Sequence, residues 1–303
     1  MTLTTKPGDD ATTMPHANPA GVGRASKCYY QGAWHDGPTA LMDSDTNATW
    51  MANTVFDGAR AFAGVVPDLA LHCQRIIRSA LSLGMKPPVT AAAIETLARE
   101  GIRRFPAETE LYVRPMFWVQ DGAIPFDPDS TRFALVLSPD PLPPATGFSA
   151  TLSPYRRPSP DQAPTQAKAA CLYPMSTLAV VEARSRGFGN AVMRSPDGTV
   201  AEFATQNLWL VKDGVYHTPV PNGCFLAGIT RARVLQLLRD AGHRVEERAI
   251  AVEELHTADE IFSTGNHGKV LPLIRYEDRA LTHHEATMVA RSLYFEFAKS
   301  EPI

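Results

Sequence analysis

The stretch AKAACLY at residues 167–173 places Lys168 among small apolar residues, five positions before Tyr173. A second stretch, DGTVAE at residues 197–202, ends in Glu202, 34 positions after the lysine (202 − 168 = 34). Apolar surroundings lower the pKa of an amine and make it a nucleophile towards aldehydes. The acid follows a tight Asp-Gly turn and can face a protonated ring nitrogen. We therefore expect these three side chains to converge on one site.

Such a site matches the chemical needs of pyridoxal 5′-phosphate (PLP). The cofactor needs an amine for its aldehyde, a hydroxyl for its phenolic oxygen and a carboxylate for its pyridine nitrogen. A single lysine in an alanine-rich stretch is more often an exposed helical residue. Other parts of the sequence must therefore decide between the two interpretations.

Composition narrows the class of protein. The chain has 303 residues, of which 44% are hydrophobic and 20% charged, as in a soluble globular protein with room for two domains. Its formal net charge of −3 gives no reason to expect binding to nucleic acid or to an anionic membrane. No apolar run approaches the roughly 18–20 residues of a membrane helix.

The ends and the cysteines of the chain indicate a cytoplasmic protein. Residues 1–25 are polar and lack an apolar signal segment, so we expect a flexible arm. Cys28, Cys73, Cys171 and Cys224 are scattered without a CxxC pair. Reduced thiols are the expected state of such cysteines.

Hydrophobic periodicity predicts an α+β fold. The expected helices cover residues 72–83, 91–105, 174–186, 230–240 and 285–299. The expected strands cover residues 28–36, 59–63, 110–119, 132–138 and 259–263. Hairpin turns are expected at Asp197-Gly198 and Asp213-Gly214.

A proline-rich stretch divides these elements into two groups. Prolines crowd residues 139–147, and proline cannot sit inside a helix or a central strand. We therefore predict a small domain at residues 26–138, a linker at 139–150 and a large cofactor-binding domain at 151–303.

Two further segments have the character of a phosphate site. In LAGITR at residues 226–231, Gly228 allows a close approach and Thr230 offers a hydroxyl at a helix start. The segment STGNHG at residues 263–268 is a similar strand-to-turn stretch, and Arg75 could add a guanidinium. The ordinary alternatives are a threonine N-cap, a Gly-Asn turn and a surface arginine.

The order of the motifs is more specific than any one of them. The chain carries, in sequence, FDGARAF, HCQR with Ser79-Ala80, YVRP, AKAACLY, GTVAE with Gln206-Asn207-Leu208, GITR and STGN. In this order they resemble the class IV aminotransferases, the fold-type-IV PLP enzymes, and most of all the branched-chain amino acid aminotransferase group. The similarity covers residue 28 to the C-terminus. It implies PLP as cofactor, a smaller N-terminal α/β domain, a larger C-terminal domain and a homodimer.

The resemblance implies a role for each motif residue near the cofactor ring. Lys168 would be the catalytic residue, which holds the cofactor covalently and later moves a proton between Cα and C4′. Glu202 would keep the pyridine nitrogen protonated, and Tyr173 would donate a hydrogen bond to the phenolic oxygen.

The phosphate and the substrate would have their own residues. The resemblance implies that Arg75, Ile229, Thr230 and Asn266 hold the phosphate. It also implies that Arg60, Tyr112, Arg114 and His267 line the substrate side. Arg114 matches an arginine that can meet a second carboxylate, such as that of glutamate, although ion-pair roles for Arg60 and Arg114 stay open.

Some positions depart from the family pattern. The family usually has Gly-Thr-Ala where this chain has Gly265-Asn266-His267, so an amide replaces one phosphate hydroxyl. Met51 replaces a usual aromatic residue, and Phe203 replaces a small one. We expect these changes to surround the pocket and to bear on the substrate, because (R)-selective amine transaminases branch from the same family by such changes.

The expected function is transfer of an amino group from an amino acid or amine donor to a 2-oxo acid by a ping-pong mechanism. The alternatives are an (R)-selective amine transaminase, a lyase like the aminodeoxychorismate lyases, and a non-catalytic relative of the same fold. The RGxxxRxH pattern of D-amino acid aminotransferases is absent after Tyr112. A metal site at His283-His284 and a nucleotide loop at residues 21–24 are not expected.

Overall fold

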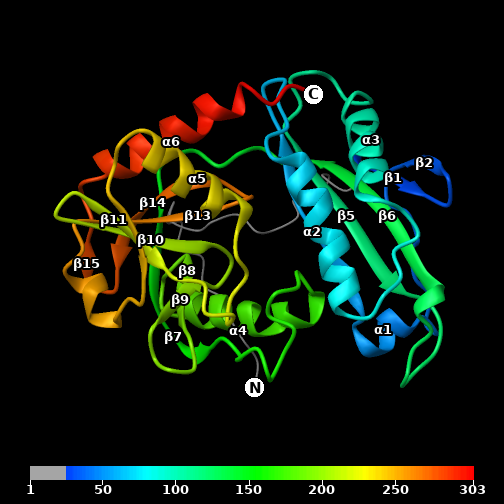
Figure 1. Ribbon diagram of the computed structural model, residues 1–303, viewed down its shortest axis with the longest axis horizontal. Coiled ribbons are helices and arrows are strands. Elements are labelled where there is room, and N and C mark those ends of the chain that lie inside the picture. The colour runs from blue at the N-terminus through cyan, green and yellow to red at the C-terminus, as the bar shows by residue number, and fades with distance from the viewer. Residues whose placement is uncertain (1–24) are drawn as a thin grey trace.

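Two β-sheets organise the chain, which a computed structural model describes over residues 25–303. Each sheet forms the centre of one lobe, and the two lobes lie side by side (Figure 1). Helices and strands are mixed in both lobes, and the predicted α+β class is confirmed. The predicted arm at residues 1–25 lies outside the described residues, apart from Ala25.

The small lobe is built on a six-stranded sheet in the order β2-β1-β6-β5-β3, with β4 also paired to β5. Its strands are β1 Lys27–Tyr30, β2 Ala33–Asp36, β3 Thr54–Phe56, β4 Ala59–Ala61, β5 Leu111–Val119 and β6 Thr131–Pro139. Its helices are α1 Asn47–Met51, α2 Leu69–Ser82, α3 Ala91–Ile102 and the 3₁₀ turn η2 Pro128–Ser130.

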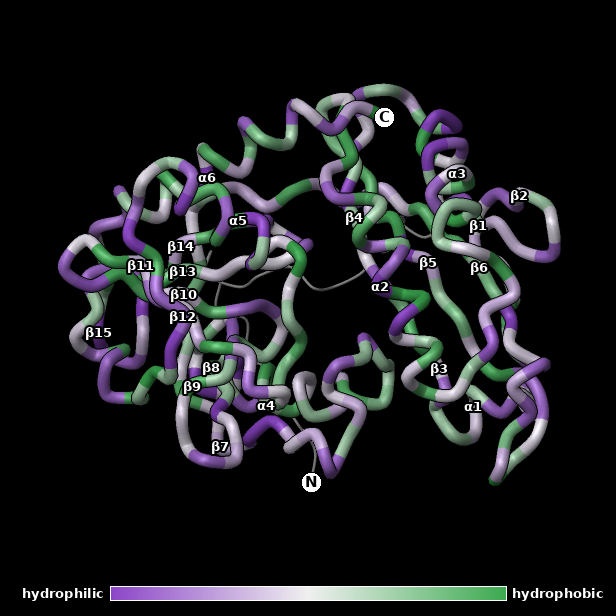
Figure 2. Tube along the Cα trace, viewed as in Figure 1, coloured by the Kyte–Doolittle hydropathy of each residue, from purple (hydrophilic) through white to green (hydrophobic). Residues whose placement is uncertain are grey.

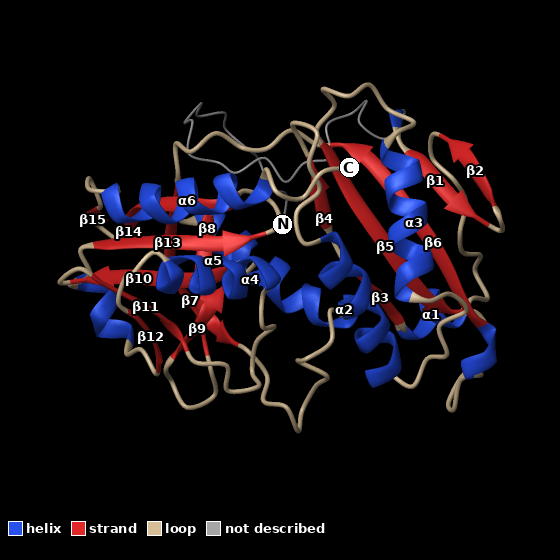
Figure 3. Ribbon diagram, turned by 45° about the horizontal axis from the view of Figure 1, so that its top comes forward, coloured by secondary structure: helices blue, strands red, loops and turns tan. Residues whose placement is uncertain are grey.

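Alternation along β5 explains how this lobe packs. Leu111, Val113 and Phe117 are buried on one face, where α2 and α3 cover the sheet (Figure 3). Along α2, hydrophobic and hydrophilic residues alternate as an amphipathic helix requires (Figure 2). The helix is followed by Gly84, whose φ of 77° is accessible without a side-chain clash.

The large lobe is built on a nine-stranded sheet in the order β12-β11-β10-β13-β14-β7-β8-β9, with β15 paired to β14. Its strands are β7 Phe148–Arg156, β8 Asn190–Arg194, β9 Val200–Phe203, β10 Asn207–Lys212, β11 Val215–Pro219, β12 Val245–Arg248, β13 Glu260–Gly265, β14 Lys269–Tyr276 and β15 Arg279–Ala280. Its helices are η3 Ala170–Leu172, α4 Tyr173–Ser185, α5 Ile229–Asp240, η4 Val252–His256 and α6 Glu285–Ala298.

Backbone hydrogen bonds from the Lys168 segment and from the C-terminus join the lobes, as does the ion pair of Arg233 with Asp68. Lys168 lies just before η3, and its segment pairs with the small lobe: the backbone N–H of Phe56 donates to the Lys168 carbonyl at 3.1 Å, and the Lys168 N–H donates to Ser79 Oγ at 3.1 Å. The C-terminus also returns to the small lobe (Figure 1), where the Val66 N–H donates to the Glu301 carbonyl at 2.9 Å. The predicted domain boundaries stay a prediction.

All five predicted helices are present, with ends shifted by a few residues. The strand expected at 28–36 is the β1–β2 hairpin, and both Asp-Gly turns connect strands, β8 to β9 and β10 to β11. Strands β3, β7, β12, β14 and β15 were not predicted from the sequence.

Candidate active site

An open cavity of about 880 Å³ lies where the Lys168 segment meets both lobes. Its walls include all the residues predicted to bind the cofactor, together with Tyr112. These residues come from six segments: those of Arg75 and Tyr112 in the small lobe, and those of Lys168, Glu202, helix α5 and Asn266 in the large lobe. The fold therefore brings together side chains that are far apart in the sequence.

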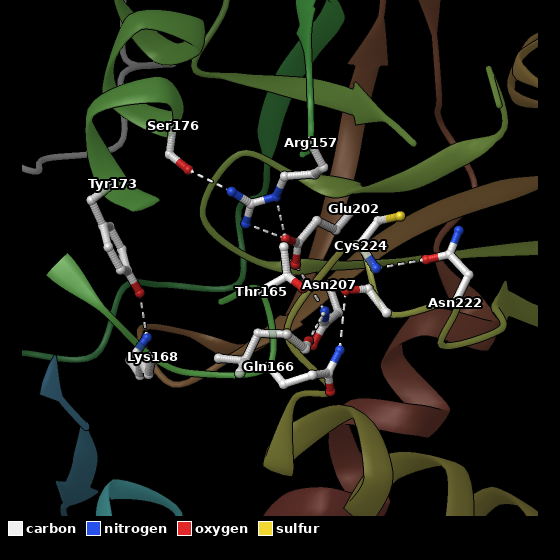
Figure 4. Close-up of polar contacts among 12 residues, drawn as sticks. Arg157, Thr165, Gln166, Lys168, Tyr173, Ser176, Glu202, Asn207, Asn222 and Cys224 are labelled. Carbon is white, nitrogen blue, oxygen red and sulfur yellow. Dashed lines mark hydrogen bonds and ion pairs between the residues drawn. The ribbon is translucent and has the colours of Figure 1, made fainter. Parts of the chain in front are cut away.

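Lys168 and Tyr173 form the centre of this cavity. Lys168 Nζ donates to Tyr173 Oη at 2.5 Å and lies 4.9 Å from the centre of the Phe56 ring (Figure 4). Burial and then Arg75 lower the pKa of the amine, but Tyr173, Tyr112 and Asp57 together raise it by more. The net pKa lies above its ordinary value, so the expectation of a lowered pKa from apolar neighbours is wrong.

Glu202 is the centre of a second polar network, on β9. Arg157 donates Nε to Glu202 Oε1 at 2.7 Å, its Nη2 donates to the same oxygen, and its Nη1 donates to Ser176 Oγ at 3.1 Å (Figure 4). Asn207 Nδ2 donates to the other carboxylate oxygen at 3.0 Å. The network holds the carboxylate in one orientation inside the cavity wall. Burial raises the pKa of this carboxyl more than Arg157 lowers it.

Arg157 is a site residue that the sequence did not reveal. It lies directly after β7, 45 positions before Glu202, and the Arg156-Arg157-Pro158 run carries no motif. Arg157 and Glu202 come together because β8 pairs with both β7 and β9. In the sequence, only the position of Arg157, 11 residues before Lys168 (168 − 157 = 11), could have pointed to a place near the site.

Arg75 is anchored by Asp57 of the FDGARAF motif. Its Nε donates to Asp57 Oδ2 at 2.6 Å and its Nη2 donates to Oδ1 at 2.7 Å, while His72 Nδ1 lies 2.7 Å from Oδ1. Burial raises the pKa of the Asp57 carboxyl, but Arg75 and His72 lower it by more, and it lies well below its usual range. An ionised carboxylate only accepts, so His72 donates from Nδ1. Arg75 is buried and lines the cavity, which excludes a surface arginine.

The far end of the cavity suits a phosphate. Helix α5 begins at Ile229, and within the described residues no side chain caps its N-terminus, so its first N–H groups are open to an anion. Thr230 is buried beside them. Asn266 Nδ2 is buried in the cavity wall and has no hydrogen-bond partner among the described residues. A Cβ on Gly58 would lie 2.3 Å from Tyr112 Oη and 3.1 Å from this atom, so the lack of a side chain at Gly58 makes room for both polar groups.

Three predicted substrate residues lie outside the cavity wall. Arg60 is buried, forms an ion pair with Asp140 and donates Nη2 to the Pro141 carbonyl at 3.1 Å. Arg114 is exposed on the Tyr112 face of β5, two residues farther along. His267 lies in the turn beside Asn266. The contacts of Arg60 therefore match the ion-pair role that the sequence left open for it.

Two of the substitutions expected around the pocket, Met51 and Phe203, lie outside its wall, whereas Asn266 lies in it. Phe203 is wholly buried in the core of the large lobe, with its ring 5.1 Å from that of Phe148. Side chains alternate along a strand, so Glu202 and Ala204 face the cavity while Phe203 faces away. Met51, the last residue of α1, is not part of the cavity wall either. The expectation that both residues surround the pocket is wrong for the described chain.

Other kinds of site find no support in residues 25–303. No group of three or more His, Cys, Asp or Glu side chains is placed to hold a metal ion. None of the helices there is long and apolar enough to cross a membrane.

Known proteins resemble this chain in sequence and in fold. A model of the class IV aminotransferase family matches residues 54–276. A probable branched-chain-amino-acid aminotransferase of Aquifex aeolicus is 30% identical over 264 residues, which cover 82% of this chain and 83% of that protein. The solved structure of an aminotransferase from Brucella abortus bound to PLP is 45% identical, with a TM-score of 0.90, and covers 91% of this chain and 100% of that one.

A third relative is a branched-chain aminotransferase of the archaeon Thermoproteus uzoniensis, solved with norvaline. It is 29% identical, with a TM-score of 0.84, over 91% of this chain and 95% of that one. The family model alone spans most of the chain, from the first strand of the FDGARAF region to the end of β14. Because sequence, fold and cavity agree, the chain belongs to the class IV aminotransferases and is a PLP-dependent aminotransferase.

Proposed function

We propose that this aminotransferase moves amino groups between amino acids of the branched-chain kind and 2-oxo acids by a ping-pong reaction. The convergence of Lys168, Tyr173 and Glu202 on one cavity carries the catalytic part of the proposal. The substrate class is supported by the relatives named for branched-chain amino acids. It is also supported by apolar side chains in the cavity wall, among them Leu172 and Phe225.

We assign the residue roles from the geometry of the cavity. When bound, PLP supplies an aldehyde that condenses with amines and a ring that accepts the electron pair released at the substrate Cα. Lys168 Nζ is the amine placed to bind the aldehyde and, once released, the base that moves the proton at Cα. Tyr173 Oη, 2.5 Å from this amine, helps hold its position. Glu202, oriented by Arg157 and Asn207, holds a proton at the ring nitrogen.

The remaining cavity residues bind and orient. The N–H groups at the start of α5, Thr230 and Asn266 meet the phosphate, and Arg75 adds positive charge while Asp57 fixes its direction. Tyr112 lines the substrate side, and Arg114 and His267 border it in the assembled enzyme. Arg60 supports Tyr112 from behind, with its guanidinium carbon 6.0 Å from the centre of the ring.

A homodimer is part of the proposal. Helix α4 exposes Met175, Leu178 and Val181, which lie three residues apart on neighbouring turns and so share one side of the helix. Exposed apolar patches of this kind mark interaction surfaces. Sedimentation equilibrium of the purified protein should give twice the chain mass of 33.0 kDa. A monomer at micromolar concentration would remove this part of the proposal.

We also place the enzyme in the cytoplasm. All four cysteines are free, and Cys28, Cys73 and Cys224 are buried. Burial raises the pKa of the Cys73 thiol to about 12, which keeps it protonated and unreactive. These properties suit a reducing compartment.

The substrate class is tested by half-reactions followed by absorbance, with isoleucine, leucine, glutamate, D-alanine and both enantiomers of 1-phenylethylamine as donors. We expect the branched-chain amino acids to convert the cofactor fastest. Conversion by (R)-1-phenylethylamine alone would replace the proposal with an amine transaminase. The described structure does not favour that second function, because Met51 and Phe203 lie outside the cavity wall.

A further inference from the structure

A second buried lysine, Lys269, lies directly behind the phosphate end of the cavity. It is the first residue of β14, and only 1% of it is exposed. Its Nζ donates to Asn266 Oδ1 at 3.0 Å. None of the roles proposed above involves Lys269. Burying a charged amine lowers the stability of a fold, so its presence here needs an explanation.

The contact orients the Asn266 amide. As an ammonium, Lys269 only donates, and its hydrogen bond goes to the amide oxygen. The amide nitrogen then faces the opposite way, into the cavity wall, where it has no partner among the described residues. This unpaired donor lies in the cavity wall close to Gly58, the residue before β4, and to the Tyr112 hydroxyl.

We propose that Lys269 is a positioning residue for the cofactor phosphate, which holds Asn266 with its amide N–H groups towards the phosphate oxygens and adds positive charge behind them. The pair of Asn266 and Lys269 then does the work of the hydroxyl that the family usually has at position 266. The inference rests on the assignment of PLP as the cofactor. It adds a residue that does not itself line the cavity.

Charged groups from several elements face the Lys269 amine. Arg60 on β4, Asp68 before α2 and His72 on α2 are close enough to influence its charge, and the Tyr294 ring of α6 lies 5.6 Å away. Burial, and then the like charge of Arg60, lower the pKa of Lys269 to about 7, although Asp68 raises it. Arg291 of α6 is turned towards the carbonyls of neighbouring residues.

This environment couples cofactor binding to protons. A doubly charged phosphate near Lys269 raises the pKa of the amine, so the protein takes up a proton as PLP binds at pH values above about 7. Affinity for PLP should therefore fall as pH rises from about 7 towards the higher pKa of the bound state. The ammonium is also the form that donates most strongly to Asn266.

Lys269→Met tests the proposal by PLP binding to the apoprotein, followed as fluorescence quenching, and by the melting temperature without cofactor. We expect PLP affinity to fall about tenfold or more. The apoprotein should melt no earlier than wild type, because methionine removes a buried charge. Unchanged affinity, or an apoprotein destabilised with no change in affinity, would overturn the proposal. Lys212→Met, at an exposed lysine paired with Asp259, is the matched control and should change neither the PLP affinity nor the melting temperature.

A conservative variant separates position from charge. Lys269→Gln can still donate to Asn266 Oδ1, so we expect an affinity between those of wild type and Lys269→Met. Affinity should fall more steeply between pH 7 and 9 in wild type than in Lys269→Gln, and the difference between the two excludes the titration of the phosphate itself near pH 6. Parallel pH profiles would contradict the role of the lysine charge.

A double-mutant cycle tests whether Lys269 acts through Asn266. Lys269→Met should lower PLP affinity much less in an Asn266→Ala background than in wild type. Fully additive losses would show that Lys269 does not position the amide. If wild type itself fails to bind PLP, the cofactor assignment is at fault; if wild type binds and Lys269→Met binds equally well, only this inference falls.

Discussion

Lys168 is half-buried in the cavity wall and Lys269 is buried outside it, and the pKa values of the two amines move in opposite directions. Around Lys168, burial lowers the pKa, but Tyr173, Tyr112 and Asp57 together raise it to a net value above the ordinary one. Around Lys269, burial and the nearby Arg60 lower it to about 7. Both amines have a hydrogen-bond acceptor, at 2.5 Å and 3.0 Å.

Burial alone therefore does not determine the pKa of a lysine amine. An acceptor that can carry negative charge favours the ammonium, whereas a neutral amide beside a guanidinium does not. The amine with the lower pKa, Lys269, lies outside the cavity wall, whereas Lys168 lies within it. The position of Lys168 in the cavity, and not a lowered pKa, distinguishes it as the reactive amine.

The largest expected effect comes from removing the amine inside the cavity. Lys168→Ala should lower turnover by about 10⁴-fold or more, because the covalent link and the proton transfer at Cα are both lost. Steady-state rates and thermal melting measure the result, with Lys212→Ala as the control. A variant that keeps a tenth of the wild-type rate would show that Lys168 is not the catalytic amine.

Glu202→Gln should have the next largest effect, because it removes the negative charge that holds the ring nitrogen protonated. We expect the rate to fall about 10²- to 10³-fold while PLP binding changes little. Single-turnover absorbance measures the rate, and dialysis measures cofactor retention. A rate near that of wild type would remove Glu202 from the mechanism.

Arg75→Ala should weaken PLP binding and also destabilise the apoprotein, because Asp57 is left buried without its partner. Breaking such a pair costs about 3–5 kcal/mol. The Asp57 pKa is lowered in the folded protein, so this stabilisation is present above the unfolded pKa of about 4 and is lost as pH falls through the folded value.

Urea unfolding at pH 7 and at pH 3.5 checks this prediction. The gap between wild type and Arg75→Ala should shrink at the lower pH. Arg78→Ala, at an exposed arginine on the same helix, is the control. Equal unfolding free energies for the two variants at pH 7 would show that the Asp57 pair contributes nothing.

The smallest effect is expected at Arg114, which is exposed in the single chain. If it meets a second carboxylate, Arg114→Ala should slow the half-reaction with glutamate about tenfold. Leucine should react at nearly the wild-type rate, because an apolar side chain has no use for a guanidinium. Equal losses for both donors would make Arg114 a structural residue.

The sequence predicted those parts of the fold that have strong periodicity. Helices α2 and α3 and strands β5 and β6 are near their expected places. Strands β7 and β14 were missed, and each contains a proline, Pro154 and Pro272, which normally argues against a central strand, although alternation identified β5 despite Pro115. Strand β12 was missed because VEER has no apolar alternation.

The site was predictable where a residue lies in a motif, and less so where it depends on strand pairing. Lys168, Tyr173 and Glu202 line one cavity as expected. Arg157 reaches Glu202 only through the order of β7, β8 and β9, which no single-sequence pattern specifies. The direction of the Lys168 pKa shift was not predicted, because it is the balance of burial against Tyr173 and charged or phenolic groups from the other lobe.

Borohydride reduction of the PLP-loaded protein at pH 7, followed by peptide mapping, tests the central claim most directly. The two lysines make opposite predictions, because Lys269 has more free amine at this pH while Lys168 has the position. The account predicts a pyridoxyl label on Lys168 and none on Lys269. A label on Lys269, or on any lysine other than Lys168, would contradict it.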